Sequence, residues 1–437
     1  MEEPVGRDER EAEWEAAAAE VDAAYELHDS YSAEHKLLLA QHAARAHALL
    51  AALAPASARE RAQIALLRGK LLDSSPAYSA EAEALLTRAV KLEPRSIDAW
   101  NALAECVWKG GQLELARACL DEALRVRATC GSLCQLSMLL RAMSGSASDG
   151  ADVPLVLDSL RFAKEAVALD VECGRAWFVL GSACLAAFFA ATREVHDLRS
   201  ALKAYHRAAS AARRPQEGCA DLHYNRAIVL QYLLEYGQAC CAFASAHRLA
   251  PELGAGAHRA ALLAFARKCA EAVAARGHLP RKRLQQLAAA LRAAPDPPPA
   301  AVGLHGAQLS GLALGSNDRA CVSASVVAEL VPAAQTPLCY VCVDRSGDAA
   351  LLCVYNTVPS AISVLQTVCV LRPDRRALLV PLDGGGELQL DVLVVEEPAT
   401  QLLVQGAALL PAHVGRARVT STAAPAPPRA SGDSFDR

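Results

Sequence analysis

Cysteine is the most chemically versatile residue type in this 437-residue chain, which contains 15 cysteines. Their odd number and scattered positions do not form a disulfide framework. Cys339 and Cys342 have CxxC spacing, which suits zinc binding or thiol redox chemistry, but no second pair accompanies them. They also fall in a strand-like segment, where residues three apart point to opposite faces. We therefore interpret the cysteines as small buried hydrophobic residues and expect no metal and no cofactor.

Catalytic motifs are absent from the sequence. We find no HExxH, no glycine-rich phosphate loop, no GxSxG and no cluster of metal ligands. The run DGGGE lies between two strand-like runs and is typical of a hairpin turn. We predict a binding protein and no enzyme.

Charged and polar residues flank one apolar run and could recognise a peptide. Arg141 closes the run LSMLLR, Asp221 stands near the start of ADLHYNRA, and Tyr224 and Asn225 follow one turn later. Between them, Trp177 begins an almost wholly apolar run. Opposite charges would flank an apolar floor, which suits an extended peptide with an apolar first residue, one basic residue and one acidic residue. Alternatively, Arg141 is a solvated helix-end arginine, Asp221 an N-cap and Trp177 a packing residue.

A second surface for binding is the basic segment RGHLPRKR (276–283). Its charges are Arg276, Arg281, Lys282 and Arg283, and no aromatic residue lies among them. Such a cluster suits phosphate contact and not base reading, which predicts salt-sensitive attachment to RNA. The alternative is a solvated helix end.

These residues must be positioned by a repeat. One segment has the tetratricopeptide order of large and small residues over about 34 residues. Its positions are Trp100, Leu103, Ala104, Val107, Ala116, Leu120 and Ala123. Three further segments fit the pattern, one with an insertion between its helices. Small residues at fixed points let paired helices approach closely, so we predict a helical solenoid whose first helices line a concave surface.

The pattern changes after the run RAAPDPPPAA, because consecutive prolines exclude helix and central strand. Short β-rich runs with turn signals follow, and five or six strands favour an OB-fold. The fold class is multidomain, α then β: a tetratricopeptide solenoid followed by an OB-fold barrel. We divide the chain into N-terminal capping helices (1–57), tetratricopeptide repeats with insertions (58–254), capping helices with the basic segment (255–293), a Pro-rich linker (294–303), the OB-fold (304–410) and a disordered tail (411–437).

Composition limits the cellular context. We find no apolar run of the ~20 residues that a membrane span needs, and expect no membrane partner. The acidic start MEEPVGRDEREAEWE is unlike a signal or transit peptide. The net charge of −4 implies no partner by itself. We expect a cytoplasmic and nuclear protein.

Several runs resemble the tetratricopeptide repeat protein five family, also called Strap. They are GKLLDSSPAYSAEAEALLTRAVKLEP, AWNALAECVWKGG, LSMLLR, GRAWFVLGSACL, ADLHYNRA and VYNTV. The resemblance implies a ribosome-associated reader of the Met-Arg-Glu start of α- and β-tubulin, which triggers tubulin mRNA decay through a decay adaptor (tubulin autoregulation). It also implies a stress-responsive transcriptional cofactor in DNA damage, linked to an acetyltransferase coactivator and to actin-nucleation and p53 cofactor proteins.

The resemblance also implies residue roles. Family positions matching Arg141 and Asp221 contact the nascent tubulin start. We expect Arg141 to pair the peptide's Glu, Asp221 its Arg, and Asn225 to bind peptide backbone. The family's basic segment touches the ribosome, which implies rRNA phosphate contact. Ala255 stands where the family has an acidic residue, and Glu252 is a nearby substitute.

Two other binding functions fit the sequence less well. A cochaperone clamp needs Lys, Arg and Asn on consecutive first helices, whereas Asn101, Glu105 and Lys109 share one helix and the helix of the third repeat is apolar. Nucleic-acid binding by the OB-fold needs several stacking aromatics, and few are present beyond Tyr340 and Tyr355. A protein or chromatin partner for the OB-fold remains an equal alternative.

Overall fold

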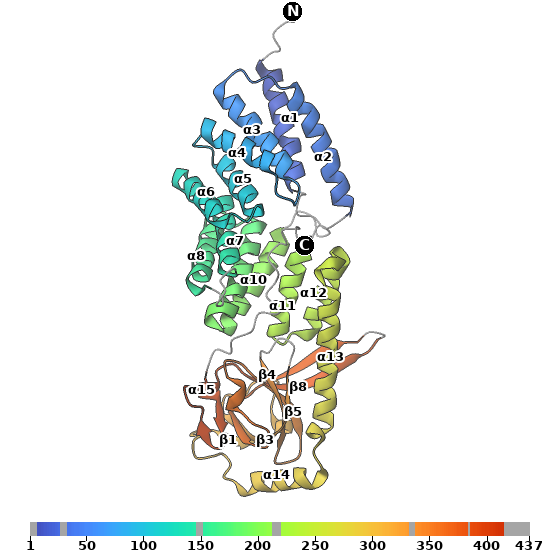
Figure 1. Cartoon of the computed structure of the whole chain (residues 1–437). Helices are drawn as coiled ribbons and strands as arrows, with labels where there is room; N and C mark the ends of the chain where they lie inside the picture. Colours follow the sequence, from blue (N-terminus) through green and yellow to red (C-terminus); the bar gives the residue numbers. More distant parts are fainter. Residues whose placement is uncertain are drawn as a thin grey trace, which may run out of the picture. The chain divides into compact units, whose positions relative to one another are not determined.

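The structure, a computed structural model, describes residues 7–26, 33–145, 152–211, 220–331, 337–382 and 385–414 (Figure 1). Most of the predicted disordered tail lies outside them. The described residues form two compact units. The first includes residues within Met1–Ala191 and Lys203–Leu222, and the second includes those within Thr192–Leu202 and His223–Ala424.

The first unit is a stack of helix pairs, as the repeat predicts (Figure 1). Its helices are α1 (Arg7–Glu26), α2 (Ala33–Ala52), α3 (Ala58–Asp73), α4 (Ala80–Leu92), α5 (Ile97–Lys109), α6 (Leu113–Val126), α7 (Cys130–Gly145), α8 (Val153–Leu169) and α9 (Gly174–Ala187). Each of α3, α5 and α7 packs against the helix that follows it, and α3, α5, α7 and α9 contact one another in that order. We call these four helices the inner layer.

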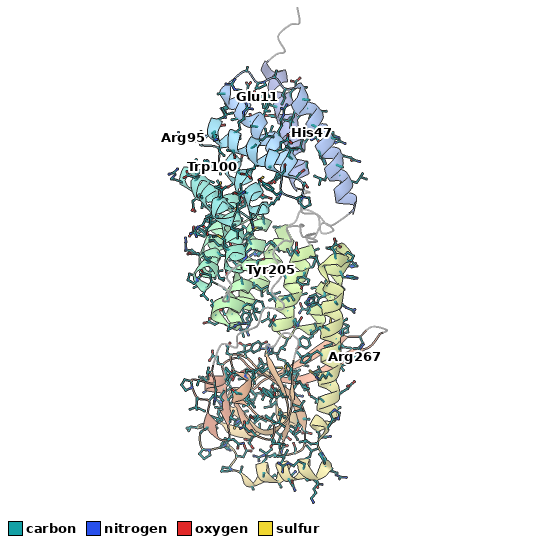
Figure 2. The ribbon with its side chains drawn as sticks, viewed as in Figure 1. Glu11, His47, Arg95, Trp100, Tyr205 and Arg267 are labelled. Carbon is teal, nitrogen blue, oxygen red and sulfur yellow. The ribbon has the colours of Figure 1, made fainter. Side chains whose placement is uncertain are left out.

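Close approach of paired helices explains the small residues of the repeat. A Cβ atom on Gly69 would lie 2.6 Å from Cγ of Leu86, and one on Gly181 would lie 2.6 Å from Cε1 of Tyr205 (labelled in Figure 2). Both glycines belong to first helices, and both partners are large residues of the repeat pattern. A side chain at either glycine would push its helix pair apart.

The two repeat tryptophans have the same structural role. Nε1 of Trp100 donates to the Pro94 carbonyl at 2.9 Å, and Nε1 of Trp177 donates to the Val171 carbonyl at 2.8 Å. Each indole is therefore hydrogen-bonded from the start of a first helix to the turn before it. Helix starts are also capped by side chains, as where Ser96 accepts from the Ala99 N–H.

One helical segment corrects the expectation about apolar runs. Gly174–Thr192 consists of α9 and the π-helical turn Phe188–Thr192, and it is long and apolar enough by length and composition to cross a membrane. Half of the most apolar 18-residue stretch of this segment is buried inside the fold. Its buried residues pack in the repeat core, which explains why an inner-layer helix is so apolar.

The second unit joins helices to a curled β-sheet (Figure 1). Its helical elements are parts of α10 (Val195–Ala211) and α11 (Ala220–Tyr232), then α12 (Tyr236–Leu249), α13 (Ala255–Ala274), α14 (Arg281–Ala293) and α15 (Pro398–Gln401). Its strands are β1 (His305–Ala307), β2 (Gly315–Ser316), β3 (Ala320–Leu330), β4 (Leu338–Asp344), β5 (Ala349–Val354), β6 (Thr367–Leu371), β7 (Asp374–Pro381), β8 (Glu387–Val395), β9 (Leu402–Val404) and β10 (Ala407–Ala408).

The sheet has the order β10-β9-β6-β3-β4-β5-β8-β7-β2, and β1 pairs with β3. Its neighbours are antiparallel except for β1–β3 and β5–β8. Inward-facing side chains such as Val322, Leu352 and Val395 form one buried core. The α-then-β fold class is confirmed.

Helices after the repeats pack on this sheet. α12 contacts β7, α13 contacts β4, β5 and β8, and α14 contacts β3 and β4. A Cβ on Gly237 of α12 would lie 2.6 Å from the Leu379 carbonyl oxygen, and the Tyr355 hydroxyl donates to the Tyr232 carbonyl. The Pro-rich segment lies within the same unit, where Asp296 forms an ion pair with Arg345. The two compact units therefore divide the chain elsewhere than at this segment.

Candidate functional site

Arg141 is held inside the repeat unit by hydroxyl groups. Its Nη1 donates to the Ser137 hydroxyl at 3.0 Å and to the Ser159 hydroxyl at 3.2 Å. The Ser137 hydroxyl in turn donates to the Ser159 carbonyl at 2.9 Å. Ser137 and Ser159 are buried, on α7 and α8. Arg141 does not end its helix, because α7 continues to Gly145.

The charge of Arg141 has no acidic partner within the part of the chain that the structure describes. No carboxylate there lies within ion-pair distance, and burial lowers the pKa of its guanidinium to about 10. The group still carries its charge at neutral pH, since a pKa of about 10 lies well above 7. A half-buried cation without a counter-ion is suited to a ligand carboxylate.

Trp177 and Asp221 are the other predicted site residues in the first unit. The indole of Trp177 packs in the repeat core beside α7 and donates its N–H to the preceding turn, so it is a packing residue here. Asp221 lies in the first turn of α11, after Ala220, and is half-buried. An acidic residue at this position complements the helix dipole.

Tyr224 and Asn225 belong to the second unit, where α11 continues. The Tyr224 hydroxyl lies 3.1 Å from Nε2 of His258, and its ring contacts Phe243 edge-on at 5.8 Å between centroids. Burial raises the pKa of Tyr224 and lowers that of His258. Asn225 is 7% exposed. The Tyr224 side chain therefore packs against α12 and α13.

Ala255, at the family's acidic position, and Glu252, its nearby substitute, differ in exposure. Ala255, the first residue of α13, is fully buried. Glu252 is exposed in the short turn Pro251–Leu253. Only Glu252 can therefore offer a carboxylate to a ligand.

A polar network on the inner layer was not expected from the sequence. Lys109 donates to the Asp73 carboxylate at 3.1 Å and to the Asp73 carbonyl at 2.6 Å. Asn101 accepts from the Ser132 hydroxyl at 2.9 Å, and Glu105 accepts from the Gln135 amide at 3.2 Å. Burial raises the pKa of Asp73 to about 6, against the pull of Lys109. The residues that a cochaperone clamp would use are thus engaged within the chain.

The basic segment surrounds the junction of α13 and α14. Arg281, Lys282 and Arg283 are exposed in the first turn of α14, and Arg276 donates its Nε to the Gly347 carbonyl at 2.9 Å. None of these four has a carboxylate within ion-pair distance among the residues the structure describes. Further exposed cations lie at Arg267 (labelled in Figure 2), Lys268 and Arg292.

The sheet buries its own reactive and aromatic groups. Cys342 lies in the barrel core, whereas Sγ of Cys339 lies 3.6 Å from Sγ of Cys353 on the neighbouring strand. The CxxC residues therefore do not converge on one point. Tyr340 and Tyr355 are 0% and 1% exposed, so neither ring offers a stacking surface to a base.

The fold and these surfaces define a tetratricopeptide-repeat adaptor, a protein-interaction protein that carries an OB-fold. A model of the tetratricopeptide repeat protein 5 OB fold domain matches residues 303–418, and a tetratricopeptide repeat model matches residues 79–136.

Sequence relatives identify the family. Tetratricopeptide repeat protein 5 of Homo sapiens is 34% identical over 332 residues, covering 73% of this chain and 75% of the human protein. That of Mus musculus is 35% identical over the same length. The chain belongs to the tetratricopeptide repeat protein 5 family, which confirms the resemblance seen in its sequence. Among solved structures, the hetero-tetramer Cut9–Hcn1 of APC/C is similar with a TM-score of 0.41 and 16% identity, over 53% of this chain and 43% of that chain.

Proposed function

We propose that this protein reads the Met-Arg-Glu start of nascent tubulin on the ribosome and recruits an adaptor for decay of the tubulin messenger. The observation that carries the proposal is Arg141, a half-buried guanidinium on the inner layer with no carboxylate partner among the described residues. Membership of the family supports the choice of ligand.

The recognition has a simple chemical basis. Nη1 of Arg141 donates to Ser137 and Ser159, and the rest of the planar guanidinium fork can face a ligand. A glutamate carboxylate fits this fork with two parallel hydrogen bonds. Asp221 offers the opposite charge for the peptide's arginine.

The basic segment supports attachment to the ribosome. Three cations in the first turn of α14 oppose the helix dipole, whose N-terminal end is positive. Three cations at a helix N-terminus disfavour the helix locally, and an external anion bound there would offset this cost. The phosphate of rRNA is the anion that a translating ribosome presents.

Binding of fluorescent Met-Arg-Glu-Ile peptide to the full chain tests the proposal. We expect binding to weaken at least tenfold in Arg141→Ala, because a charged hydrogen bond of this kind contributes ~1.5–3 kcal/mol. Peptides Met-Arg-Gln-Ile and Met-Gln-Glu-Ile each lack one side-chain charge, so they measure the contributions of the glutamate and of the arginine separately. Arg161→Ala is the control, since Arg161 on α8 already pairs with Asp158 and Glu165. Equal binding of all three peptides would contradict tubulin reading.

A transcriptional cofactor is the second candidate. Tyr340 on β4 and Tyr355 just after β5 are both buried. Without exposed aromatic rings for base stacking among the described residues of the sheet, a protein partner for the OB-fold, such as an acetyltransferase coactivator in the nucleus, is favoured over nucleic acid. Coprecipitation with that coactivator, retained in Arg141→Ala, would separate this role from peptide reading.

A further inference from the structure

Three metal-binding side chains converge in the first unit. The Sγ atoms of Cys130 and Cys173 and a carboxylate oxygen of Asp170 all lie within 4.8 Å of one another. The sequence did not reveal this cluster, because Cys130 is far along the chain from the other two. None of the three residues belongs to the basic segment or to the CxxC pair.

The fold creates the cluster at the starts of two inner-layer helices. Cys130 is the first residue of α7, and Cys173 is the N-cap of α9. Asp170 is the C-cap of α8, and its carbonyl accepts from the Cys173 N–H at 3.4 Å, which closes a tight turn between α8 and α9. Because α7 packs against α8 and α9, this turn lies beside the start of α7.

The three side chains are accessible, and one of them is held by a hydrogen bond. Cys173 makes no capping hydrogen bond with its side chain. Oδ1 of Asp170 accepts from the Glu172 N–H at 3.0 Å, which orients the carboxylate while its other oxygen remains for a ligand. Asp170 is exposed, and both cysteines are partly exposed, so a cation can enter from solvent.

Two local effects act in opposite directions at this cluster. Helix N-termini stabilise negative charge, and both cysteines stand at one. Burial and the neighbouring thiols of Cys134 and Cys173 raise the pKa of Cys130. A bound divalent cation reverses this balance and releases protons.

We propose that Cys130, Cys173 and Asp170 bind a thiophilic divalent cation of the zinc class, with water in the fourth position. Two sulfurs and one oxygen are ligands that zinc accepts. Tetrahedral zinc with bonds of about 2.0–2.3 Å places its ligand atoms about 3.5–3.8 Å apart. Side-chain rotations that move the three ligand atoms roughly 1 Å closer together would therefore bring them to zinc-binding distance. The cation would tie the α8–α9 turn to α7, and so fix the spacing of the helices that carry Arg141 and Trp177.

Cobalt titration of the full chain tests this site. Protein stripped of metal and kept reduced is titrated with Co²⁺, which reports thiolate ligands by a near-ultraviolet charge-transfer band and tetrahedral geometry by visible bands. We expect both signals to saturate at one cation per chain and to disappear when Zn²⁺ is added. Zn²⁺ should also raise the thermal midpoint of the protein.

Variants assign the ligands. We expect Cys130→Ser and Cys173→Ser each to abolish the cobalt bands, and Asp170→Asn to weaken binding at least tenfold. Cys241→Ser, which removes an exposed thiol of α12 outside the cluster, should change neither the bands nor the affinity. Circular dichroism without metal shows which variants fold. If a serine variant does not fold, two other results show whether the cluster binds the cation. They are the cobalt titration of Asp170→Asn and the stabilisation of the wild-type protein by Zn²⁺.

Three results would overturn the proposal. Wild-type protein that shows no charge-transfer band has no thiolate site for these cations. Bands that persist in both folded serine variants place the cation elsewhere. A Cys130–Cys173 disulfide found by mass spectrometry, with no metal bound after reduction, would make the pair a redox element instead.

Discussion

Arg141 on α7 and Ser159 on α8 are joined by a hydrogen bond of 3.2 Å from the guanidinium Nη1 to the serine hydroxyl. The contact connects the proposed peptide-binding cation on the inner layer to the helix behind it. The orientation of Arg141 therefore depends on a residue that need not touch the peptide.

Ser159→Ala tests this dependence. We expect affinity for the Met-Arg-Glu peptide to fall about two- to tenfold, because a net hydrogen bond contributes ~0.5–1.5 kcal/mol. Fluorescence anisotropy measures the affinity. The loss should be smaller for Met-Arg-Gln-Ile, which lacks the carboxylate, and an equal loss for both peptides would show general damage to the repeat.

Gly181→Val tests the close approach of repeat helices. The new Cβ would meet Cε1 of Tyr205 at 2.6 Å, so we expect destabilisation of ~1–3 kcal/mol or more, seen as a lower thermal midpoint of the full chain. Gly131→Ala, on α7 with nothing within 4 Å of its Cβ, is the matched control and should not destabilise. A Gly181→Val protein as stable as wild type would mean that the two helices separate freely.

Asp73 predicts a pH dependence of stability. Its pKa is raised from 3.8 to about 6 in the folded protein, so the folded state binds the proton more tightly than the unfolded state. This favourable contribution is complete below about pH 4 and is lost as the pH rises through about 6. The free energy of unfolding of wild type relative to Asp73→Asn should fall by at most about 3 kcal/mol across that window. Denaturant unfolding at several pH values measures it, and a difference that rises with pH would reverse the assignment.

Replacing the three cations of α14 should affect RNA binding and stability in opposite directions. The triple variant Arg281→Gln, Lys282→Gln, Arg283→Gln should reduce the slope of log affinity against log salt by about two to three, since each phosphate contact contributes ~0.7–0.9. Its thermal midpoint should stay level or rise slightly, because the cations oppose the helix dipole. Arg292→Gln at the other end of α14, where a cation complements the dipole, should lower the midpoint slightly. An unchanged salt slope in the triple variant would remove this segment as an RNA contact.

Local patterns predicted much of the fold. The recurrence of small and large residues, seen at Gly181 and Tyr205, is a short-range packing requirement, so it is visible along the chain. Gly277 and Pro280 separate α13 from α14, because glycine adopts a positive φ of 67° there and proline cannot continue a helix. Short β-rich runs with turn signals predicted the strands, but not which helices would cover them.

Sequence alone determined the repeat solenoid, the OB-fold and the family, because each depends on residue types at fixed spacing. Tertiary structure alone decided the partners of the charged groups. Arg141 meets Ser159 instead of an acid, Lys109 is engaged by Asp73, and Cys130 meets Cys173 and Asp170 only because α7 packs beside the α8–α9 turn. These contacts join residues that are distant along the chain, so they depend on how helices pack, and no short motif encodes that.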